Sequence, residues 1–469
     1  MGLREVIGFL KTGQLLLDID EKISSDYDAP WLTLKLASKT PKALLFWQVE
    51  GKQFPLATNI YYNKVERVFQ ASPNTLLSNF NKLSSFLREI SPSPSSKIGV
   101  LASLAWLSDV HPKLIEGSVF MSHSGLEVDL TILPAIRHSR DEEHPVIKNP
   151  SILLSDPNSK ENILFSEPIQ IIDEKTIQLH LPRNSRASTF IEDSARRGES
   201  INVAVMIGVS PYLQLVTKMD WLPWFDKYLL TGALAGKPMN LTKIDGLLYV
   251  PIDAEIILLG EIVPGDVRPE GKMLYEDMKL YGGSPMPLAR VKKILYKPSS
   301  VFYTSITHPV YSDDYALNKL REKFLLEYVK NLAPDITDLS FLSYDAYRTL
   351  LVTLNNPSRS RVITVGSLLF SLDINPYLDT IIVLKGGERL DNVENLVPII
   401  LSSMQPDKII YFESSPEEDS LRPERKGKVI IDATSVHIGY LDKESEFRAI
   451  APEKLQNIYE KLMREALGE

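Results

Sequence analysis

The chain contains no cysteine among its 469 residues. This absence excludes disulfide bonds, thiolate nucleophiles, iron–sulfur clusters and every zinc site that depends on cysteine ligands. Histidine is also scarce, with 7 residues scattered along the chain, and no two of them have the spacing of a metal-binding HxxxH pair. The sequence therefore contains no metal site that can be recognised from cysteine or histidine spacing alone.

Long apolar segments are missing as well. No apolar run reaches about 18 residues, the length that a membrane-spanning helix needs. The amino-terminal stretch MGLREVIGFLKTGQ has an acidic residue where a signal peptide would have its apolar region. The net charge of −8 is spread along the chain, which gives no reason to expect nucleic acid or an anionic membrane as a partner. We expect a cytoplasmic protein without a membrane span.

A chain of this length predicts about two to four domains, and 44% hydrophobic with 24% charged residues is ordinary for a soluble globular protein. Apolar spacing predicts a helix and then a strand over residues 3–19, and further helices over Ala29–Ser38 and Asp314–Leu332. Short β-rich segments fill the middle of the chain. Near the end, RVITVGSLLF, DTIIVLKGG, DKIIYFES and KVIIDAT are expected to be strands that alternate with helices, which predicts a parallel sheet.

The segment Leu248–Gly283 is organised around one carboxylate. An alternating apolar strand leads into the run EIILL and Gly260, and a Pro-Gly-Asp turn at residues 264–266 follows it. The tripeptide Pro269-Glu270-Gly271 then predicts a second break. Glu270 thus lies on a loop whose backbone is restricted on both sides, which suits acid–base chemistry. The alternative is a carboxylate that only caps the following turn.

This segment, VPxxAEIxLxGEIxPGxxRPEG, resembles the UbiD family of decarboxylases, which use prenylated FMN. In that family the block continues P-E-G-P-[FY]-G-[DE], and both of its carboxylates are catalytic. Here the continuation is PEGKMLYED. Glu270 matches the first carboxylate, Tyr275 stands at the second, and Glu276 matches it only if one residue is inserted. The resemblance also includes the segments Ala43–Gly51, Ala204–Leu215, Leu229–Leu241 and Arg422–Ser435.

The resemblance implies an architecture that combines α/β and β parts. We expect an amino-terminal α/β portion (residues 1–110), a central split β-barrel like that of flavin reductases (111–300), a linking helix (301–335) and a carboxy-terminal α/β domain (336–469). Family members assemble through the carboxy-terminal domain into dimers or hexamers. We therefore expect a homo-oligomer.

The resemblance also implies a catalytic site. In the family, prenylated FMN forms an adduct with the substrate, and a Glu–Arg–Glu network places the substrate carboxylate and supplies the proton. A divalent metal, manganese, is held by Asn, His and Glu and binds the cofactor phosphate. In this chain Asn162 matches the metal-site Asn, and Glu167 occupies the position of the Arg. A carboxylate at this position is expected to repel an acidic substrate.

Two other metal ligands of the family are replaced. The metal-site His is replaced by Arg183 or Asn184, with His180 nearby but out of register. The metal-site Glu is replaced by Lys227, which carries its own positive charge. We expect manganese to bind weakly or not at all. An alternative is that Lys227 or Arg183 binds the cofactor phosphate directly, so that protein charge replaces the metal.

Two functions are compatible with these residues. One is a UbiD-like carboxy-lyase with altered catalytic and metal residues, acting on an unsaturated or aromatic carboxylic acid. The other is a non-catalytic UbiD-like subunit that pairs with an active paralogue. The extent of the resemblance favours the first, and the loss of the Arg and of two metal ligands favours the second. The sequence leaves open whether the chain is an enzyme.

Overall fold

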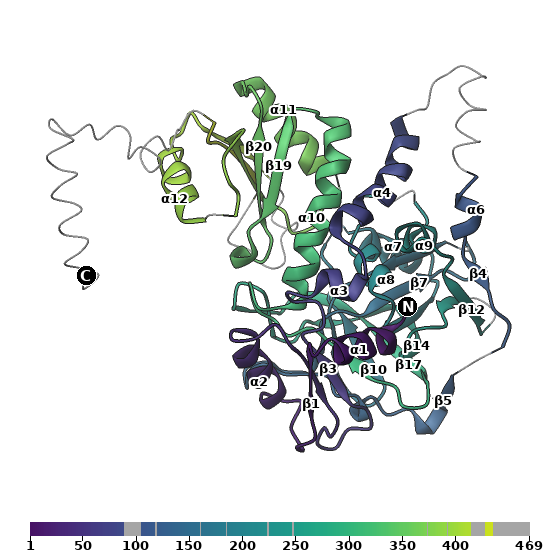
Figure 1. The fold of residues 1–469 in the computed structure, drawn as a ribbon. Helices are drawn as coiled ribbons and strands as arrows, with labels where there is room; N and C mark the ends of the chain where they lie inside the picture. Colours follow the sequence, from purple (N-terminus) through teal and green to yellow (C-terminus); the bar gives the residue numbers. More distant parts are fainter. Residues whose placement is uncertain are drawn as a thin grey trace, which may run out of the picture.

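The computed structural model describes residues 1–88, 105–117, 120–159, 161–183, 185–222, 225–245, 248–372, 374–391, 393–413 and 427–434. Within these ranges the chain is a mixed α/β protein with several sheets (Figure 1), which confirms the predicted fold class. The split barrel and the domain boundaries stay predictions. None of the helices in these ranges is both long and apolar enough to cross a membrane.

The amino-terminal portion begins as the sequence predicts, with α1 (Leu3–Thr12) followed by β1 (Leu16–Ile19). The second predicted helix is α2 (Asp28–Ala37). A four-stranded sheet has the order β1-β2-β3-β18, so its last strand comes from a distant part of the chain. The remaining elements are β2 (Ala43–Phe46), β3 (Leu56–Thr58), β18 (Phe302–Tyr303), α3 (Val65–Phe69) and α4 (Pro73–Arg88).

A nine-stranded sheet forms the centre of the molecule, with the order β6-β9-β10-β17-β14-β11-β7-β8 and with β5 paired to β17. Two long strands, β14 and β17, pair antiparallel as a hairpin whose register ends at Pro269 opposite Pro285. The strands are β5 (Met121–Ser124), β6 (Val146–Ile147), β7 (Ser151–Ser155), β8 (Asn162–Phe165), β9 (Ile169–Ile171), β10 (Thr176–Leu179), β11 (Ile201–Ile207), β14 (Ile256–Pro269) and β17 (Pro285–Tyr296).

The predicted Pro-Gly-Asp turn inside β14 is wrong. The strand continues through residues 264–266, and its pairing with β17 shifts register between Ile262 and Val267. Gly265 has a φ of 77° at this point, a backbone conformation that glycine adopts without strain. The segment is therefore a β-bulge, which bends the strand and increases its twist without ending it.

Smaller elements surround the central sheet. A three-stranded sheet has the order β13-β12-β4, and a two-stranded sheet, β15-β16, lies within the hairpin loop. The strands are β4 (Lys113–Leu114), β12 (Asn240–Ile244), β13 (Leu248–Pro251), β15 (Met273–Leu274) and β16 (Leu280–Tyr281). The helices are α6 (Leu107–Val110), α7 (Arg186–Arg196), α8 (Pro211–Val216) and α9 (Lys227–Ala235).

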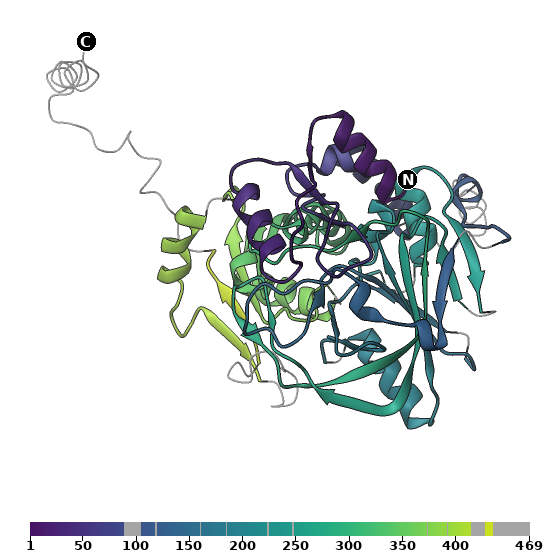
Figure 2. The same cartoon turned by 90° about the horizontal axis from the view of Figure 1, so that it is seen from below.

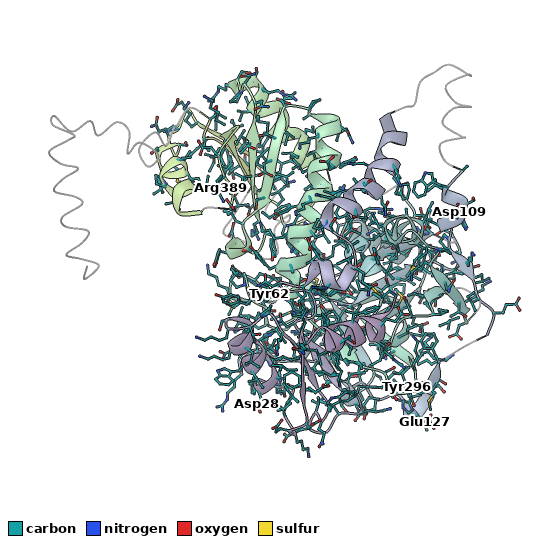
Figure 3. The ribbon with its side chains drawn as sticks, in the orientation of Figure 1. Asp28, Tyr62, Asp109, Glu127, Tyr296 and Arg389 are labelled. Carbon is teal, nitrogen blue, oxygen red and sulfur yellow. The ribbon has the colours of Figure 1, made fainter. Side chains whose placement is uncertain are left out.

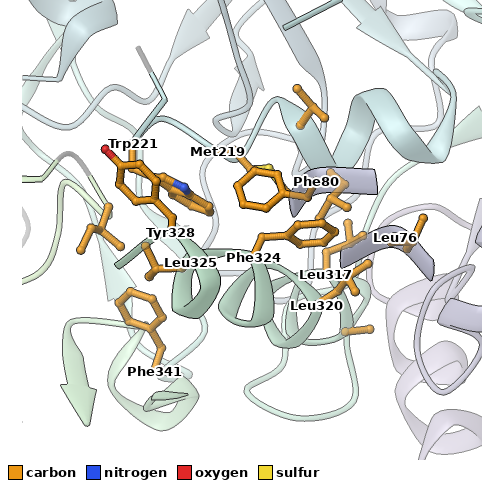
Figure 4. Close-up of a cluster of buried hydrophobic side chains, with 14 of the residues drawn as sticks. Leu76, Phe80, Met219, Trp221, Leu317, Leu320, Phe324, Leu325, Tyr328 and Phe341 are labelled. Carbon is orange, nitrogen blue, oxygen red and sulfur yellow. The ribbon is translucent and has the colours of Figure 1, made fainter. Parts of the chain in front are cut away.

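The helix α10 (Asp313–Leu332) connects the central and carboxy-terminal parts and confirms the helix predicted there. Its apolar side chains, among them Leu317 and Phe324, pack with Phe80 and Trp221 in one buried cluster (Figure 4). Its first residue also joins the helix to the amino-terminal portion. The buried Asp313 carboxylate accepts hydrogen bonds from the backbone N–H groups of residues 60–62 at 2.8, 2.7 and 2.9 Å. Tyr62, labelled in Figure 3, is the last of these residues.

The carboxy-terminal domain contains a five-stranded sheet with the order β19-β20-β21-β23-β22, beside the central sheet (Figure 2). This sheet is mixed and not parallel, because β19 pairs antiparallel with β20 and β22 pairs antiparallel with β23. The strands are β19 (Ile336–Phe341), β20 (Thr349–Leu354), β21 (Thr380–Lys385), β22 (Ile409–Phe412) and β23 (Lys428–Asp432), and the helices are α11 (Arg359–Ser371) and α12 (Val393–Ser402).

The segment RVITVGSLLF is a helix, α11, and not the predicted strand. The hydroxyl of Ser358 accepts the backbone N–H of Arg361 and so caps the first turn. The buried residues Val362, Val365 and Leu369 have helical spacing and form one face. The β-branched residues of this segment have a preference for strands, but the segment forms a helix because the helix buries this face against the sheet.

Candidate functional site

A cavity of about 110 Å³ lies where the central sheet, the loop of the β14–β17 hairpin, α10 and the carboxy-terminal domain meet. Its wall is rich in ionisable side chains, and all four parts of the molecule contribute to it. The lining residues include Lys148, Ser166, Glu167, Lys218, Asp220, Tyr275, Glu276, Asp314, Arg321, Tyr347 and Tyr377.

The hairpin loop is held in place by its own backbone. The N–H of Glu270 donates to the carbonyl of Ser284 at 2.7 Å, and the N–H of Gly283 donates to the carbonyl of Glu270 at 2.8 Å. Gly271 is required by a close approach, because a Cβ there would lie 2.8 Å from Oε1 of Gln170. The loop that the sequence predicts to be restricted is thus fixed against the central sheet.

Glu270 is buried, with 4% of its surface exposed, and does not face solvent. Its Oε1 accepts from Nδ1 of His180 at 2.6 Å and from the hydroxyl of Tyr275 at 3.3 Å. Tyr275, which stands at the position of the family's second carboxylate, lines the cavity. His180, which follows β10, therefore contacts a carboxylate through Nδ1. Its Nε2 has no hydrogen-bond partner among the residues that the structure describes.

Glu167 lies in the loop after β8, and its side chain lines the cavity. The pKa of this carboxyl is raised to about 8, mainly by burial; Lys218 and Lys148 oppose the shift, and the negative charges of Asp220 and Glu276 add to it. The carboxyl is therefore mostly protonated at neutral pH. The repulsion expected from the sequence assumed an ionised Glu167, and this protonation removes most of it.

Glu276 also lines the cavity, so two of the three candidate catalytic residues face it directly. Its Oε1 lies 3.5 Å from Nζ of Lys148, which also donates to the carbonyl of Leu274 at 3.2 Å. A second lysine, Lys218, forms an ion pair with Asp314 at 3.0 Å. Both cavity lysines are thus already paired with carboxylates of the protein.

The other three candidate residues do not join this group. Asn162 and Lys227 line a separate cavity of about 420 Å³, and Arg183 is exposed on the surface. Nζ of Lys227 is bound by Asp220 at 2.7 Å and by the carbonyl of Thr217 at 3.2 Å. The amine that replaces the family's metal-site Glu is therefore part of an internal ion pair.

The donor set does not fit a bound manganese ion. Across the described ranges, no three or more His, Cys, Asp or Glu side chains are placed to hold a metal. The matched Asn162 is exposed, and the replaced position, Lys227, presents an ammonium group. Asn184, the other candidate for the His position, lies outside the described residues. The cavity of about 110 Å³ is also smaller than the ~300–1,000 Å³ of pockets that hold cofactors and drug-sized ligands.

Arg321 is a cavity residue that the sequence reasoning missed. It comes from α10 and lies four residues after the buried Leu317, on the side of the helix that faces inward. Its guanidinium carbon lies 5.5 Å from the ring centres of both Trp221 and Phe341. The available signal was a charged residue at an inward position of an amphipathic helix.

Family models match two parts of the chain. The model of the 3-octaprenyl-4-hydroxybenzoate carboxy-lyase N-terminal domain matches residues 7–83. The model of the Rift-related domain of the same carboxy-lyase, UbiD, matches residues 115–309. The two matched ranges contain 77 and 195 of the 469 residues, and together they make up more than half of the chain.

The chain is also similar to individual relatives. An uncharacterised protein of Synechocystis is 22% identical over 454 residues, which cover 92% of this chain and 89% of the relative. A Chlamydia pneumoniae protein, named as one of the subunits of 4-hydroxybenzoate decarboxylase, is 21% identical over 428 residues, 89% of this chain and 72% of the relative.

Two solved structures share the fold. The closed form of vanillic acid decarboxylase from Sedimentibacter hydroxybenzoicus has a TM-score of 0.78 at 18% identity, and the alignment covers 99% of both chains. An evolved dimeric form of the UbiD-class enzyme HmfF from Pelotomaculum thermopropionicum, in complex with prenylated FMN, has a TM-score of 0.72 at 19% identity, covering 94% of this chain and 98% of that one. At these identities the likeness establishes the fold.

Proposed function

The chain belongs to the UbiD family, and from that premise we propose that it binds a small unsaturated or aromatic carboxylic acid without decarboxylating it. The binding site in this proposal is the cavity of about 110 Å³. An engineered cavity of about 150 Å³ binds benzene, so a cavity of this smaller volume limits the ligand to an acid with at most a single small ring.

An arginine without a carboxylate partner is the observation that supports acid binding. With Glu167 protonated, three cations of the cavity face three carboxylates, so their charges balance. Lys148 and Lys218 are paired with Glu276 and Asp314, and Asp220 is paired with Lys227, which lies outside this cavity. Among the described residues Arg321 forms no such ion pair, so it is left to attract a monoanion, whereas a neutral ligand gains nothing from its charge.

The replaced residues support the absence of turnover. Glu167 and Tyr275 stand where the resemblance places the Arg and the second carboxylate, and Lys227 occupies a metal-ligand position within an ion pair. Without a metal, the phosphate of prenylated FMN would lack the partner that the family uses. In this proposal the chain is a non-catalytic UbiD-like subunit.

A carboxy-lyase with an altered site is the second candidate, and one observation favours it. Glu167 keeps a proton at neutral pH beside the cavity, which is the property expected of a general acid. In this alternative Glu167 protonates the carbon that loses carbon dioxide, and Glu270 positions Tyr275.

The two candidates predict different results for protein produced together with the enzyme that makes prenylated FMN. We expect calorimetry to detect binding of benzoate but not of the uncharged benzamide. We also expect equilibrium dialysis to show less than about 0.1 manganese ion per chain. One tightly held manganese ion per chain, or an ordinary rate of carbon dioxide release from cinnamate, would reject the non-catalytic proposal.

We further propose that the chain forms a homo-oligomer, a dimer or a hexamer, and pairs with an active UbiD paralogue. The relative named as a decarboxylase subunit and the dimeric HmfF support this assembly. Light scattering of the protein alone, and after coexpression with a paralogue, tests both parts. A monomer in each sample would reject the assembly.

A further inference from the structure

The cations of the cavity differ in whether they already have a carboxylate partner. Lys148 is paired with Glu276 at 3.5 Å, and Lys218 is paired with Asp314 at 3.0 Å. Arg321 is different, because no carboxylate of the described ranges lies within ion-pair distance of it. A guanidinium carries its charge at every working pH and binds a carboxylate with two parallel hydrogen bonds. Arg321 is therefore the cation of this cavity that remains available to an acid.

The guanidinium of Arg321 is oriented before a ligand arrives. Nη1 donates to the carbonyl of Lys218 at 3.1 Å, and the rings of Trp221 and Phe341 lie on it at 5.5 Å each. These contacts restrict the side chain, so less conformational entropy is lost when a ligand binds. The rings also exclude water, which strengthens the attraction for an anion.

Four buried polar atoms of the same cavity have no hydrogen-bond partner among the described residues. They are Nε of Arg321, Oγ of Ser166, Oδ2 of Asp314 and the hydroxyl of Tyr347. Buried polar groups are rarely left unsatisfied, and a group of them around one cavity indicates a polar ligand or ordered water. Nε is a donor on the edge of the guanidinium that could form one of the two bonds to a carboxylate.

We propose that Arg321, projecting from α10, holds the carboxylate of the acid, with the Glu167 side chain lining the same cavity as a second polar contact. The acid-binding arginine of this chain is thus on the linking helix and not on the strand that carries Asn162 and leads to Glu167. The ligand class is a monocarboxylate with one small ring, since one cation is available and the volume is about 110 Å³. The inference rests on the proposed acid binding.

Calorimetry with benzoate at pH 6.5 tests the assignment on the full chain. Arg321→Gln is expected to raise the dissociation constant roughly 10- to 100-fold, the effect of losing one charge-assisted interaction. Arg321→Lys keeps the charge but loses the planar fork, and a loss of roughly 3- to 10-fold is expected. The matched control is Lys323→Gln, because Lys323 is exposed on the same helix and does not line this cavity. It should bind benzoate like the unaltered protein.

The outcomes separate this inference from the proposal on which it rests. If the unaltered protein binds benzoate and Arg321→Gln binds it within about twofold, the assignment to Arg321 is wrong while acid binding stands. The assignment is also wrong if Lys218→Gln abolishes binding and Arg321→Gln does not. If the unaltered protein binds neither benzoate nor cinnamate, acid binding and the role of Arg321 fail together.

Removal of Arg321 could also disturb the fold, because its guanidinium packs between two rings. Near-ultraviolet circular dichroism of each variant reports the packing of the aromatic side chains, Trp221 among them. If Arg321→Gln does not fold, the decision passes to Arg321→Lys, whose ammonium and aliphatic stem remain. Benzoate binding by folded Arg321→Lys within about twofold of the unaltered protein would overturn the proposal, and a larger loss would support it.

Discussion

Replacement of Glu270 tests whether the hairpin loop is anchored by a buried carboxylate or only carries one at its surface. A loop carboxylate is expected from the sequence to have little effect on the melting temperature. The structure leads to a different expectation, because Glu270 is buried and its Oε1 accepts from both His180 and Tyr275. Stability should therefore depend on what replaces it.

The two replacements remove different parts of this interaction. Glu270→Gln keeps an oxygen that can accept both hydrogen bonds and loses the charge, which should cost about 1 kcal/mol, the difference between a charged and a neutral hydrogen bond. Glu270→Ala leaves the N–H of His180 and the O–H of Tyr275 without an acceptor. Each unpaired buried donor costs about 1–3 kcal/mol, so a loss of roughly 2–6 kcal/mol is expected for the two.

Thermal unfolding followed by circular dichroism measures both effects. For a domain of this size, about 1 kcal/mol corresponds to a change of roughly 2–4 °C in the melting temperature. The matched control is Glu261→Gln on β14, which removes an ion pair with the largely exposed Lys292 and should cost less than about 1 kcal/mol. If the melting temperature of Glu270→Ala lies within about 1 °C of that of Glu261→Gln, Glu270 does not anchor the loop as a buried carboxylate.

Two further predictions concern pH. The pKa of Glu167 is about 8 in the folded chain, against an ordinary value of 4.5. The folded chain therefore holds a proton that the unfolded chain has lost, and the free energy of unfolding should fall as the pH rises between these two values. Glu167→Gln should remove this pH dependence of the free energy of unfolding, measured with urea. Ionisation of Glu167 should also weaken benzoate binding above pH 8, which the same variant should prevent. Burial would raise the pKa of Glu142, but hydrogen bonds from the His138 side chain and from the backbone N–H groups of Leu274 and His138 outweigh it and hold the pKa at about 2. The stability that Glu142 contributes should therefore be complete above about pH 4.5 and be lost towards pH 2, and Glu142→Gln should melt lower at pH 7 with a weaker acid dependence.

The sequence was most informative where local pattern and tertiary structure agree. The helix at Asp313–Leu332 follows from the spacing of its apolar residues, and it is present. The loop at Glu270 follows from its flanking proline and glycine, and the backbone there is fixed. Both features depend on residues that are close in the chain, so a short segment contains the information.

Features that depend on distant residues were missed. The bulge at Gly265 has the composition of a turn, and only pairing with β17 makes it a continuing strand. The ion pair between Lys227 and Asp220 depends on the path of the chain between α8 and α9. The protonated state of Glu167 depends on burial among charges from several elements. Arg321 lies 159 residues after Asn162 in the matched site segment, so no motif could contain both.

One nuclear magnetic resonance measurement tests the central claim most directly. Benzoate labelled with carbon-13 in its carboxyl group is incubated with an equal amount of protein produced together with the enzyme that makes prenylated FMN. The account predicts that the carboxyl resonance broadens or shifts on addition of the protein and that no labelled bicarbonate appears over a day. A growing bicarbonate signal would contradict the absence of turnover, and an unchanged carboxyl resonance would contradict acid binding.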